Sequence, residues 1–125
     1  PPPGWMDTVS TAMRNLNTAA GCSVGPTNLS LEVYAADAVP SVRSRLTGWA
    51  FVLRGEAGLR ADERLRWWCG DDDVSMKARR AGGLVRVPGF PVPNEHADQT
   101  TSDVLAAQAA QDMATFVEIW GRRPW

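Results

Sequence analysis

Apolar residues recur at helical spacing at the start of the chain and form short continuous runs further along it. The first pattern predicts an amphipathic helix over residues 4–17, with an apolar face of Trp5, Val9, Met13 and Leu16. A short apolar run from Cys22 to Val24 predicts a buried strand, which the following Gly-Pro pair ends. The run from Trp49 to Leu53 is rich in β-forming residues and bounded by glycines, so we expect a second strand, covered on both faces.

The second half of the chain has clearer element boundaries. Residues 71–81 predict a helix with acids in its first turn and bases toward its end, an order that complements the helix dipole. A strand over residues 84–87 follows, and residues 100–120 predict a long helix whose apolar stripe is Leu105, Ala109, Met113, Phe116, Val117 and Trp120. Residues 27–45 are interpreted as a loop with weak order, although LSLEVYAA alternates like a strand. Helices alternating with short strands indicate an α/β fold, in one domain over residues 1–125.

Composition and charge exclude several functional classes. The 125 residues carry a formal net charge of -1 at a sequence pI of about 5.8, so neither nucleic acid nor an anionic membrane is indicated as a partner. No apolar run approaches the ~20 residues that span a bilayer, and no signal peptide is visible. Cys22 and Cys69 lack the spacing of a zinc site, which favours reduced thiols in a cytoplasmic protein. Because the chain starts at PPPGW without methionine, we expect a fragment or a processed product.

Three consecutive aspartates, Asp71 to Asp73, open the predicted helix. Capping and the positive end of the helix dipole account for one or two acids at this place. They account poorly for a third, because adjacent carboxylates repel one another unless a cation or bases share the site. The cluster is therefore a candidate for a general base that takes a proton from a hydroxyl, or for part of a divalent-cation site.

Histidine, lysine and tryptophan add candidates that have both structural and functional interpretations. His96, the one histidine, lies in a polar loop and is either a surface residue or a metal ligand. Lys77 belongs to a basic run that is either the solvated end of a helix or faces a diphosphate. Trp67 and Trp68 lie in a segment that we interpret as extended, so one should join the core and the other should face a ligand. An indole face packs well on the apolar face of a sugar ring.

The order of these motifs resembles the C-terminal half of family-2-type glycosyltransferases with the GT-A fold. The matching pieces are Gly48 to Glu56, Asp62-Glu63, Trp67-Trp68, Asp71 to Lys77, Ala81-Gly82, Val87-Pro88 and His96. The N-terminal stretch PPPGWMDTVSTAMRN…GCSVGP is similar to the part of these enzymes that follows their metal-binding DxD motif. The chain departs from the family at Gly70, where glutamate is usual, and at Lys77, where arginine is usual. The donor-binding half with its DxD would lie before Pro1.

The resemblance implies a partial GT-A, Rossmann-like fold, with a short mixed sheet flanked by helices and a long C-terminal helix. It also implies an inverting, hexosyltransferase-like transfer of a sugar from a nucleotide-sugar to a hydroxyl of a carbohydrate, lipid-linked or protein acceptor. Asp71 would be the general base, and a shift of the alignment by one residue would give that role to Asp72. An upstream half-domain, or an oligomer, would complete the site.

The resemblance assigns further roles around the reacting groups. Lys77 would bind the diphosphate, and His96 would help to hold a Mn²⁺ or Mg²⁺ ion that neutralises it. The acceptor or sugar would be bordered by Gly48, Trp49, Trp67, Trp68 and Asp73.

Two other functions are compatible with the same residues. A non-catalytic glycan- or protein-binding module, derived from the same fold, would use the aromatic residues without turnover. A metal-dependent phosphate-cleaving enzyme would use the acidic cluster and the histidine, but it needs ligands from several separate segments.

Overall fold

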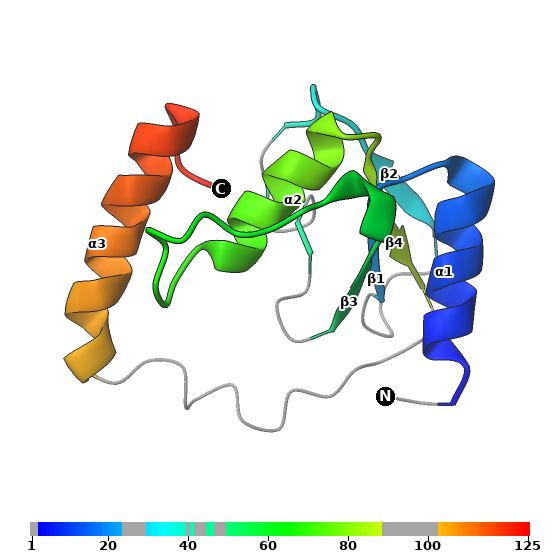
Figure 1. Cartoon of the computed structure of the whole chain (residues 1–125), viewed down its shortest axis with the longest axis horizontal. Coiled ribbons are helices and arrows are strands. Elements are labelled where there is room, and N and C mark those ends of the chain that lie inside the picture. The colour runs from blue at the N-terminus through cyan, green and yellow to red at the C-terminus, as the bar shows by residue number, and fades with distance from the viewer. Residues whose placement is uncertain (1–2, 24–29, 40, 42–44, 47–49, 89–102) are drawn as a thin grey trace.

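A four-stranded mixed sheet lies between helices in the structure, which is a computed structural model (Figure 1). It describes residues 3–23, 30–39, 41, 45–46, 50–88 and 103–125. In chain order the elements are α1 (Trp5–Leu16), β1 (Ala20–Ser23), β2 (Glu32–Tyr34), β3 (Phe51–Leu53), the short 3₁₀ helix η2 (Gly55–Ala57), α2 (Gly70–Arg80), β4 (Leu84–Val87) and α3 (Asp103–Trp120).

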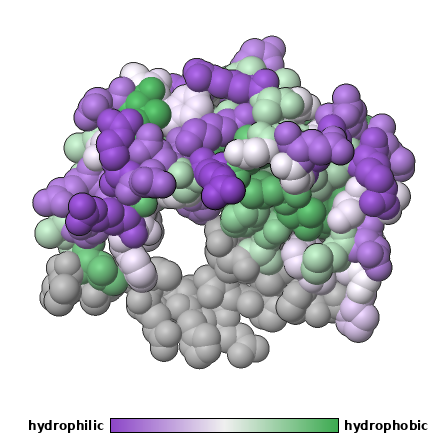
Figure 2. All heavy atoms as spheres, viewed as in Figure 1, coloured by the Kyte–Doolittle hydropathy of each residue, from purple (hydrophilic) through white to green (hydrophobic). Residues whose placement is uncertain are grey.

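The strand order is β2-β4-β1-β3, with a parallel pair at the centre and an antiparallel strand at each edge. The central strand β1 is buried along its whole length, and β4 is buried except at Arg86. All three residues of the edge strand β3 are half-buried. Hydrophobic side chains gather over β3 on the face that Figure 2 shows. The central strands therefore carry the core of the sheet.

The helix α1 covers one face of the sheet. Its buried residues Val9 and Met13 pack with Val85 and Val87 of β4. Gly21 of β1 allows this close approach, because a β-carbon added there would lie 2.8 Å from a methyl carbon of Val9 and 2.9 Å from Cγ of Met13. The glycine is therefore needed for packing rather than for an unusual backbone conformation.

The helix α2 covers the other face of the sheet. Its residues Val74 and Ala78 join a buried cluster with Ala20, Cys22 and Leu84 of the central strands. At the end of α2, the backbone N–H of Gly83 donates to the carbonyl of Ala78 at 2.9 Å, and Gly82 and Gly83 have φ values of 139° and 114°. Glycine is favoured in this left-handed region, so the Gly-Gly pair ends the helix and turns the chain into β4.

The long helix α3 forms an outer layer, on the side of α2 that faces away from the sheet (Figure 1). Phe116 of α3 is fully buried against Leu65, Cys69 and Met76, with Met113, Ile119 and Trp120 at the margin of this cluster. The loop before α2 and the first turns of α2 are thus packed between α3 and the rest of the fold.

Most predicted elements are confirmed, with shifts at their ends. The α/β class, the helices at 4–17 and 71–81, and the strand at 84–87 are present, and β1 begins two residues before the predicted Cys22. The predicted helix from residue 100 is seen from Asp103, the point at which the described residues resume. No helix in the described part of the chain is long and apolar enough to cross a membrane.

Several predictions are wrong. Leu16, predicted on the apolar face of the first helix, is 42% exposed. The strand predicted as covered on both faces is the half-buried edge strand β3. Residues 27–45 were expected to lack regular structure, but Glu32–Tyr34 form the strand β2. Hydrogen bonds to β4 stabilise this strand, and the local sequence pattern does not reveal such a partner. Val117 was placed on the apolar stripe of the last helix, but it is 37% exposed, and Ile119 packs inward in its place.

The close contact at Gly21 gives a stability prediction. We expect Gly21→Ala to lower the free energy of unfolding by about 1–3 kcal/mol, because the new methyl group overpacks the contact with Val9 and Met13. Urea denaturation followed by circular dichroism measures this change. Gly55→Ala is the matched control, since a β-carbon there meets nothing within 4 Å. Equal stability of the two variants would contradict the packing argument.

Candidate functional site

A cavity of about 360 Å³ lies at the N-terminal end of α2. We call it the indole cavity, and its lining residues are Arg45, Trp67, Trp68, Cys69, Gly70, Asp71, Asp72 and Trp125. Four residues that the sequence singled out, Asp71, Asp72, Trp67 and Trp68, therefore meet in one place. The predicted site residues Gly48, Trp49 and His96 lie outside the described residues.

The three aspartates occupy the first turn of α2, where successive residues are rotated by about 100°. This rotation turns each carboxylate into a different environment. Asp71 is half-buried at the cavity, whereas Asp72 and Asp73 are 3% and 0% exposed. The repulsion expected between adjacent carboxylates is thus reduced, because the two buried ones each have a basic partner.

Asp73 is a structural residue rather than part of the cavity. Its Oδ2 accepts hydrogen bonds from the backbone N–H of Asp62 at 2.8 Å and from Nζ of Lys77 at 2.7 Å. Its Oδ1 accepts from the indole N–H of Trp120 at 2.8 Å. The prediction that Asp73 contacts the sugar does not fit this arrangement, because the carboxylate is fully buried and both oxygens are occupied by protein donors.

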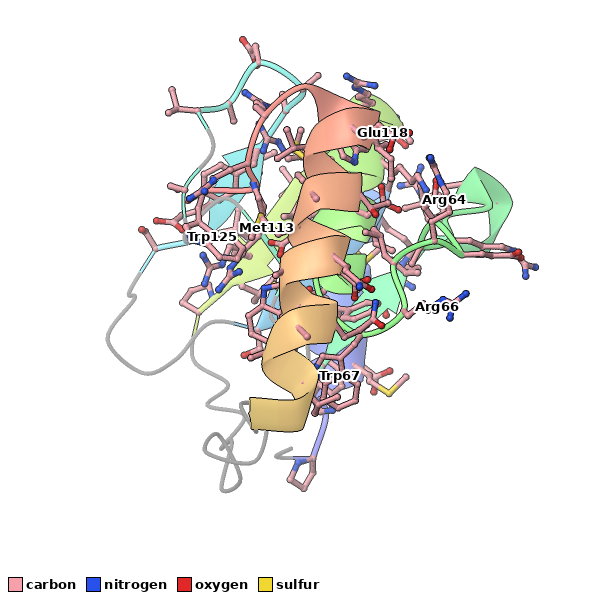
Figure 3. All side chains as sticks on the ribbon, turned by 90° about the vertical axis from the view of Figure 1, so that its left-hand side faces the viewer. Arg64, Arg66, Trp67, Met113, Glu118 and Trp125 are labelled. Carbon is pink, nitrogen blue, oxygen red and sulfur yellow. The ribbon has the colours of Figure 1, made fainter. Side chains whose placement is uncertain are left out.

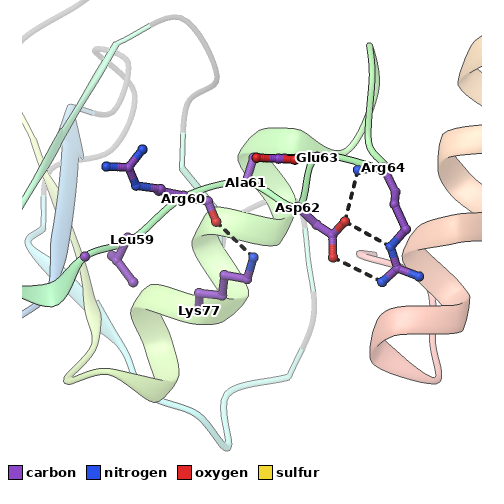
Figure 4. Close-up of a pocket in the computed structure, with 8 residues that line it drawn as sticks. Leu59, Arg60, Ala61, Asp62, Glu63, Arg64 and Lys77 are labelled. Atoms are coloured by element: carbon purple, nitrogen blue, oxygen red, sulfur yellow. Dashed lines mark hydrogen bonds and ion pairs between the residues drawn. The ribbon is translucent and has the colours of Figure 1, made fainter.

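Lys77 also differs from its predicted role. Its ammonium group binds Asp73 and donates to the carbonyl of Arg60 at 2.9 Å. It lines a different hollow of about 580 Å³, formed with residues 58–64, in which Asp62 is paired with Arg64 (Figure 4). A diphosphate at the indole cavity would not contact a lysine in this position, so the structure does not support the diphosphate-binding prediction.

Asp72 is paired with a residue that sequence reasoning missed. Nη1 of Arg45 lies 3.3 Å from Oδ1 of Asp72, and the guanidinium carbon lies 4.6 Å from the ring centre of Trp125. Burial, and then the negative charge of Asp71, raise the pKa of Asp72 to about 6, although Arg45 opposes the rise. The carboxyl group of Asp72, in the wall of the cavity, therefore loses its proton at a higher pH than an ordinary aspartate.

Asp71 is the carboxylate with an available oxygen. Its Oδ1 accepts the backbone N–H of Asp72 at 3.0 Å, and no group in the described part of the chain is hydrogen-bonded to its Oδ2. It is half-buried and lines the same cavity as Trp67, Trp68 and Trp125. Such an oxygen can accept a proton or a hydrogen bond from a bound hydroxyl group.

The two adjacent tryptophans differ in burial, and the prediction that their segment is extended is wrong. Residues 66–69 form a bend, and both tryptophans are among the residues that line the cavity. Trp68 packs against the buried cluster around Phe116, whereas Trp67 is 48% exposed. In Figure 3, Trp67 lies beside the N-terminal half of α3, and Trp125 lies on the other side of that helix from Arg64 and Glu118.

The cavity offers little to a metal ion by itself. Burial, followed by the charges of Asp72, Asp71 and Asp112, raises the pKa of the Cys69 thiol to about 12, which disfavours its thiolate form. Within the described ranges, no group of three or more histidine, cysteine or acidic residues is placed to hold a metal ion. These residues therefore do not form a complete site for the Mn²⁺ or Mg²⁺ that the resemblance implies.

Trp125, Arg45 and Asp112 were missed for different reasons. Trp125 reaches the cavity because residues 121–125 turn back from α3 toward α2 (Figure 1), and no local pattern predicts that turn or the placement of Arg45. Asp112, which is 1% exposed, could have been identified from the sequence. It lies between Ala109 and Phe116 on the apolar stripe of a predicted helix, and a buried acid needs partners.

Comparisons of the chain with family models, with curated proteins and with solved structures gave no match.

The raised pKa of Asp72 gives a pH-dependent prediction. The folded protein holds this proton up to about pH 6 and the unfolded chain only to about 3.8, so the contribution of Asp72 to stability falls as pH rises between these values. Asp72→Asn removes this loss. We therefore expect its free energy of unfolding, relative to wild type, to increase by up to ~3 kcal/mol between pH 3.8 and pH 8.

Urea denaturation at a series of pH values measures this difference. Asp7→Asn, which removes an exposed carboxylate on α1, is the control for the loss of a negative charge. A relative stability of Asp72→Asn that does not vary with pH would contradict the assignment.

Proposed function

We propose that this chain is the acceptor-binding and catalytic part of an inverting glycosyltransferase, with Asp71 as the general base. The observation that carries the proposal is the available Oδ2 of Asp71 in a cavity walled by three indoles. Among the tryptophans that line the cavity, Trp67 is the most exposed, and its ring is the best placed to lie against the apolar face of a sugar. The mixed sheet with helices on both faces is compatible with a partial GT-A fold.

The proposed reaction needs a base because a hydroxyl group is a poor nucleophile until its proton is removed. Oδ2 of Asp71 takes the proton of the acceptor hydroxyl as its oxygen forms a bond to the anomeric carbon. On the opposite face, the bond from that carbon to the diphosphate breaks, and the electron pair leaves with the diphosphate. The configuration at the anomeric carbon is thereby inverted.

Asp71 is a better candidate than Asp72 on grounds of access. A general base must come within hydrogen-bonding distance of the proton that it abstracts. Asp72 is 3% exposed and bound to Arg45, so its carboxylate reaches the cavity less readily. In the proposal, Asp72 holds the side chain of Arg45 in place at the edge of the cavity.

Further parts of the proposal rest on the resemblance alone. The donor is a nucleotide-sugar whose binding half comes from an upstream segment or another chain. His96 contributes to a Mn²⁺ or Mg²⁺ site there, and the enzyme acts in the cytoplasm on a carbohydrate, lipid-linked or protein acceptor.

Replacement of the base tests the proposal. In the protein that carries this chain with its donor-binding half, we expect Asp71→Asn to lower kcat for sugar transfer by about 10²–10⁴-fold while leaving the fold intact. Release of nucleoside diphosphate from a panel of nucleotide-sugars, with mixed oligosaccharide acceptors, measures turnover. Glu63→Gln is the control, because it removes an exposed carboxylate outside the indole cavity.

The outcomes separate the alternatives. Turnover by Asp71→Asn at the wild-type rate would exclude Asp71 as the base, and loss of turnover in Asp72→Asn alone would transfer the role to Asp72. A glycan-binding module is also supported by the three indoles. It predicts that wild type and Asp71→Asn bind oligosaccharides equally, with no turnover by either.

A further inference from the structure

A buried carboxylate of α3 holds the loop that carries the two adjacent tryptophans. Oδ2 of Asp112 accepts the backbone N–H groups of Trp67 at 2.7 Å and Trp68 at 2.6 Å. Its Oδ1 accepts the N–H of Arg66 at 3.3 Å and the side-chain amide of Gln108 at 2.8 Å. Successive backbone donors from one loop thus converge on a single side chain that lies 44 to 46 residues further along the chain.

Asp112 is charged in this position. Burial acts to raise its pKa, but the hydrogen bonds from the backbone of Trp68 and Trp67, from Gln108 and from Arg66 outweigh it, so the pKa is lowered. Hydrogen bonds to an ionised acceptor are shorter and stronger than those between neutral groups. The contact is therefore a strong constraint on the loop, and Gln108 fixes the orientation of the carboxylate that makes it.

The constrained N–H groups belong to the residues whose side chains border the indole cavity. Residues 66–69 lie in a bend, outside any regular helix or strand, so no ladder of backbone hydrogen bonds holds them in place. Fixing the peptide groups of Trp67 and Trp68 fixes the direction in which each side chain leaves the backbone. Trp67 in particular is 48% exposed, so burial alone does not fix its ring.

We propose that Asp112 is a positioning residue of the candidate sugar site, which sets the Trp67 and Trp68 rings in place before a ligand binds. This role rests on the proposed function in one respect only, namely that the ligand of the two rings is a sugar. Rings ordered in advance bind more tightly, because the cost of immobilising the side chains has already been met in the folded protein.

Fluorine NMR of the chain labelled with 5-fluorotryptophan tests the positioning. The Trp67 and Trp68 signals are assigned with Trp67→Phe and Trp68→Phe. In Asp112→Asn we expect both signals to shift and broaden, while those of Trp5 on α1 and Trp120 on α3 stay in place. Glu118→Gln is the matched control, because Glu118 is an exposed carboxylate on the same helix, paired with Arg64. Unchanged Trp67 and Trp68 signals in Asp112→Asn would overturn the proposal.

A displaced Trp120 signal in Asp112→Asn would show that α3 itself has moved, so this variant could not isolate the effect on the loop. Hydrogen exchange in the wild-type protein then decides the question. The amides of Trp67 and Trp68 should exchange at least about tenfold more slowly than the amide of Glu63, a nearby loop residue, because Asp112 holds them. Equal exchange rates would overturn the proposal.

Titration of the labelled chain with methyl glycosides separates this proposal from the proposed function. If both hold, the sugars shift the Trp67 and Trp68 signals, and Asp112→Asn binds them at least about tenfold more weakly. If Asp112→Asn displaces the rings but no glycoside binds wild type, the sugar site is wrong and the positioning role stands.

Discussion

The buried carboxylate of Asp73 is the contact on which the arrangement of the site depends. It joins the loop at Asp62, the second turn of α2 at Lys77 and the end of α3 at Trp120. A buried charge that loses its partner costs about 3–5 kcal/mol, so these donors have to stay in place together. With Asp73 fixed inward, the helical rotation of about 100° per residue determines where Asp71 and Asp72 point. The exposure of Asp71 is thus a consequence of how its neighbour is held.

The helix α3 holds both ends of the segment that forms the cavity. Asp112 binds the backbone at residues 66–68, and Trp120, two turns later, binds Asp73 in the first turn of α2. The sheet contributes indirectly, since it orients α2 through the cluster that includes Val74 and Ala78. The candidate chemistry therefore lies at the contact between α2 and α3, and packing of the outer helix is a condition for the site to form.

The predictable part of the structure is the part that local pattern determines. The spacing of Val9 and Met13, and the Gly-Gly pair after α2, were enough to predict α1 and the end of α2. The edge strand β2 was missed because its stability comes from β4 rather than from its own residues. Candidate site residues were found through the acidic run and the tryptophan pair, but Arg45 and Trp125 reach the cavity by tertiary folding. The i, i+4 spacing of Asp73 and Lys77 is that of a salt bridge within a helix, which the structure contains, whereas the resemblance implied a ligand contact for each residue.

The charge of the indole cavity supports its assignment to an acceptor rather than to a diphosphate. Its described lining contains the carboxylates of Asp71 and Asp72 and one guanidinium, that of Arg45. Above the pKa of Asp72, at about 6, this combination carries a net negative charge, which disfavours a polyanion. A neutral sugar is not repelled by this negative charge. One of its hydroxyl groups can donate a hydrogen bond to the available oxygen of Asp71 while the sugar ring lies against an indole. The negative charge of the cavity thus supports the proposal that the acceptor binds in this cavity and that the donor diphosphate binds outside it.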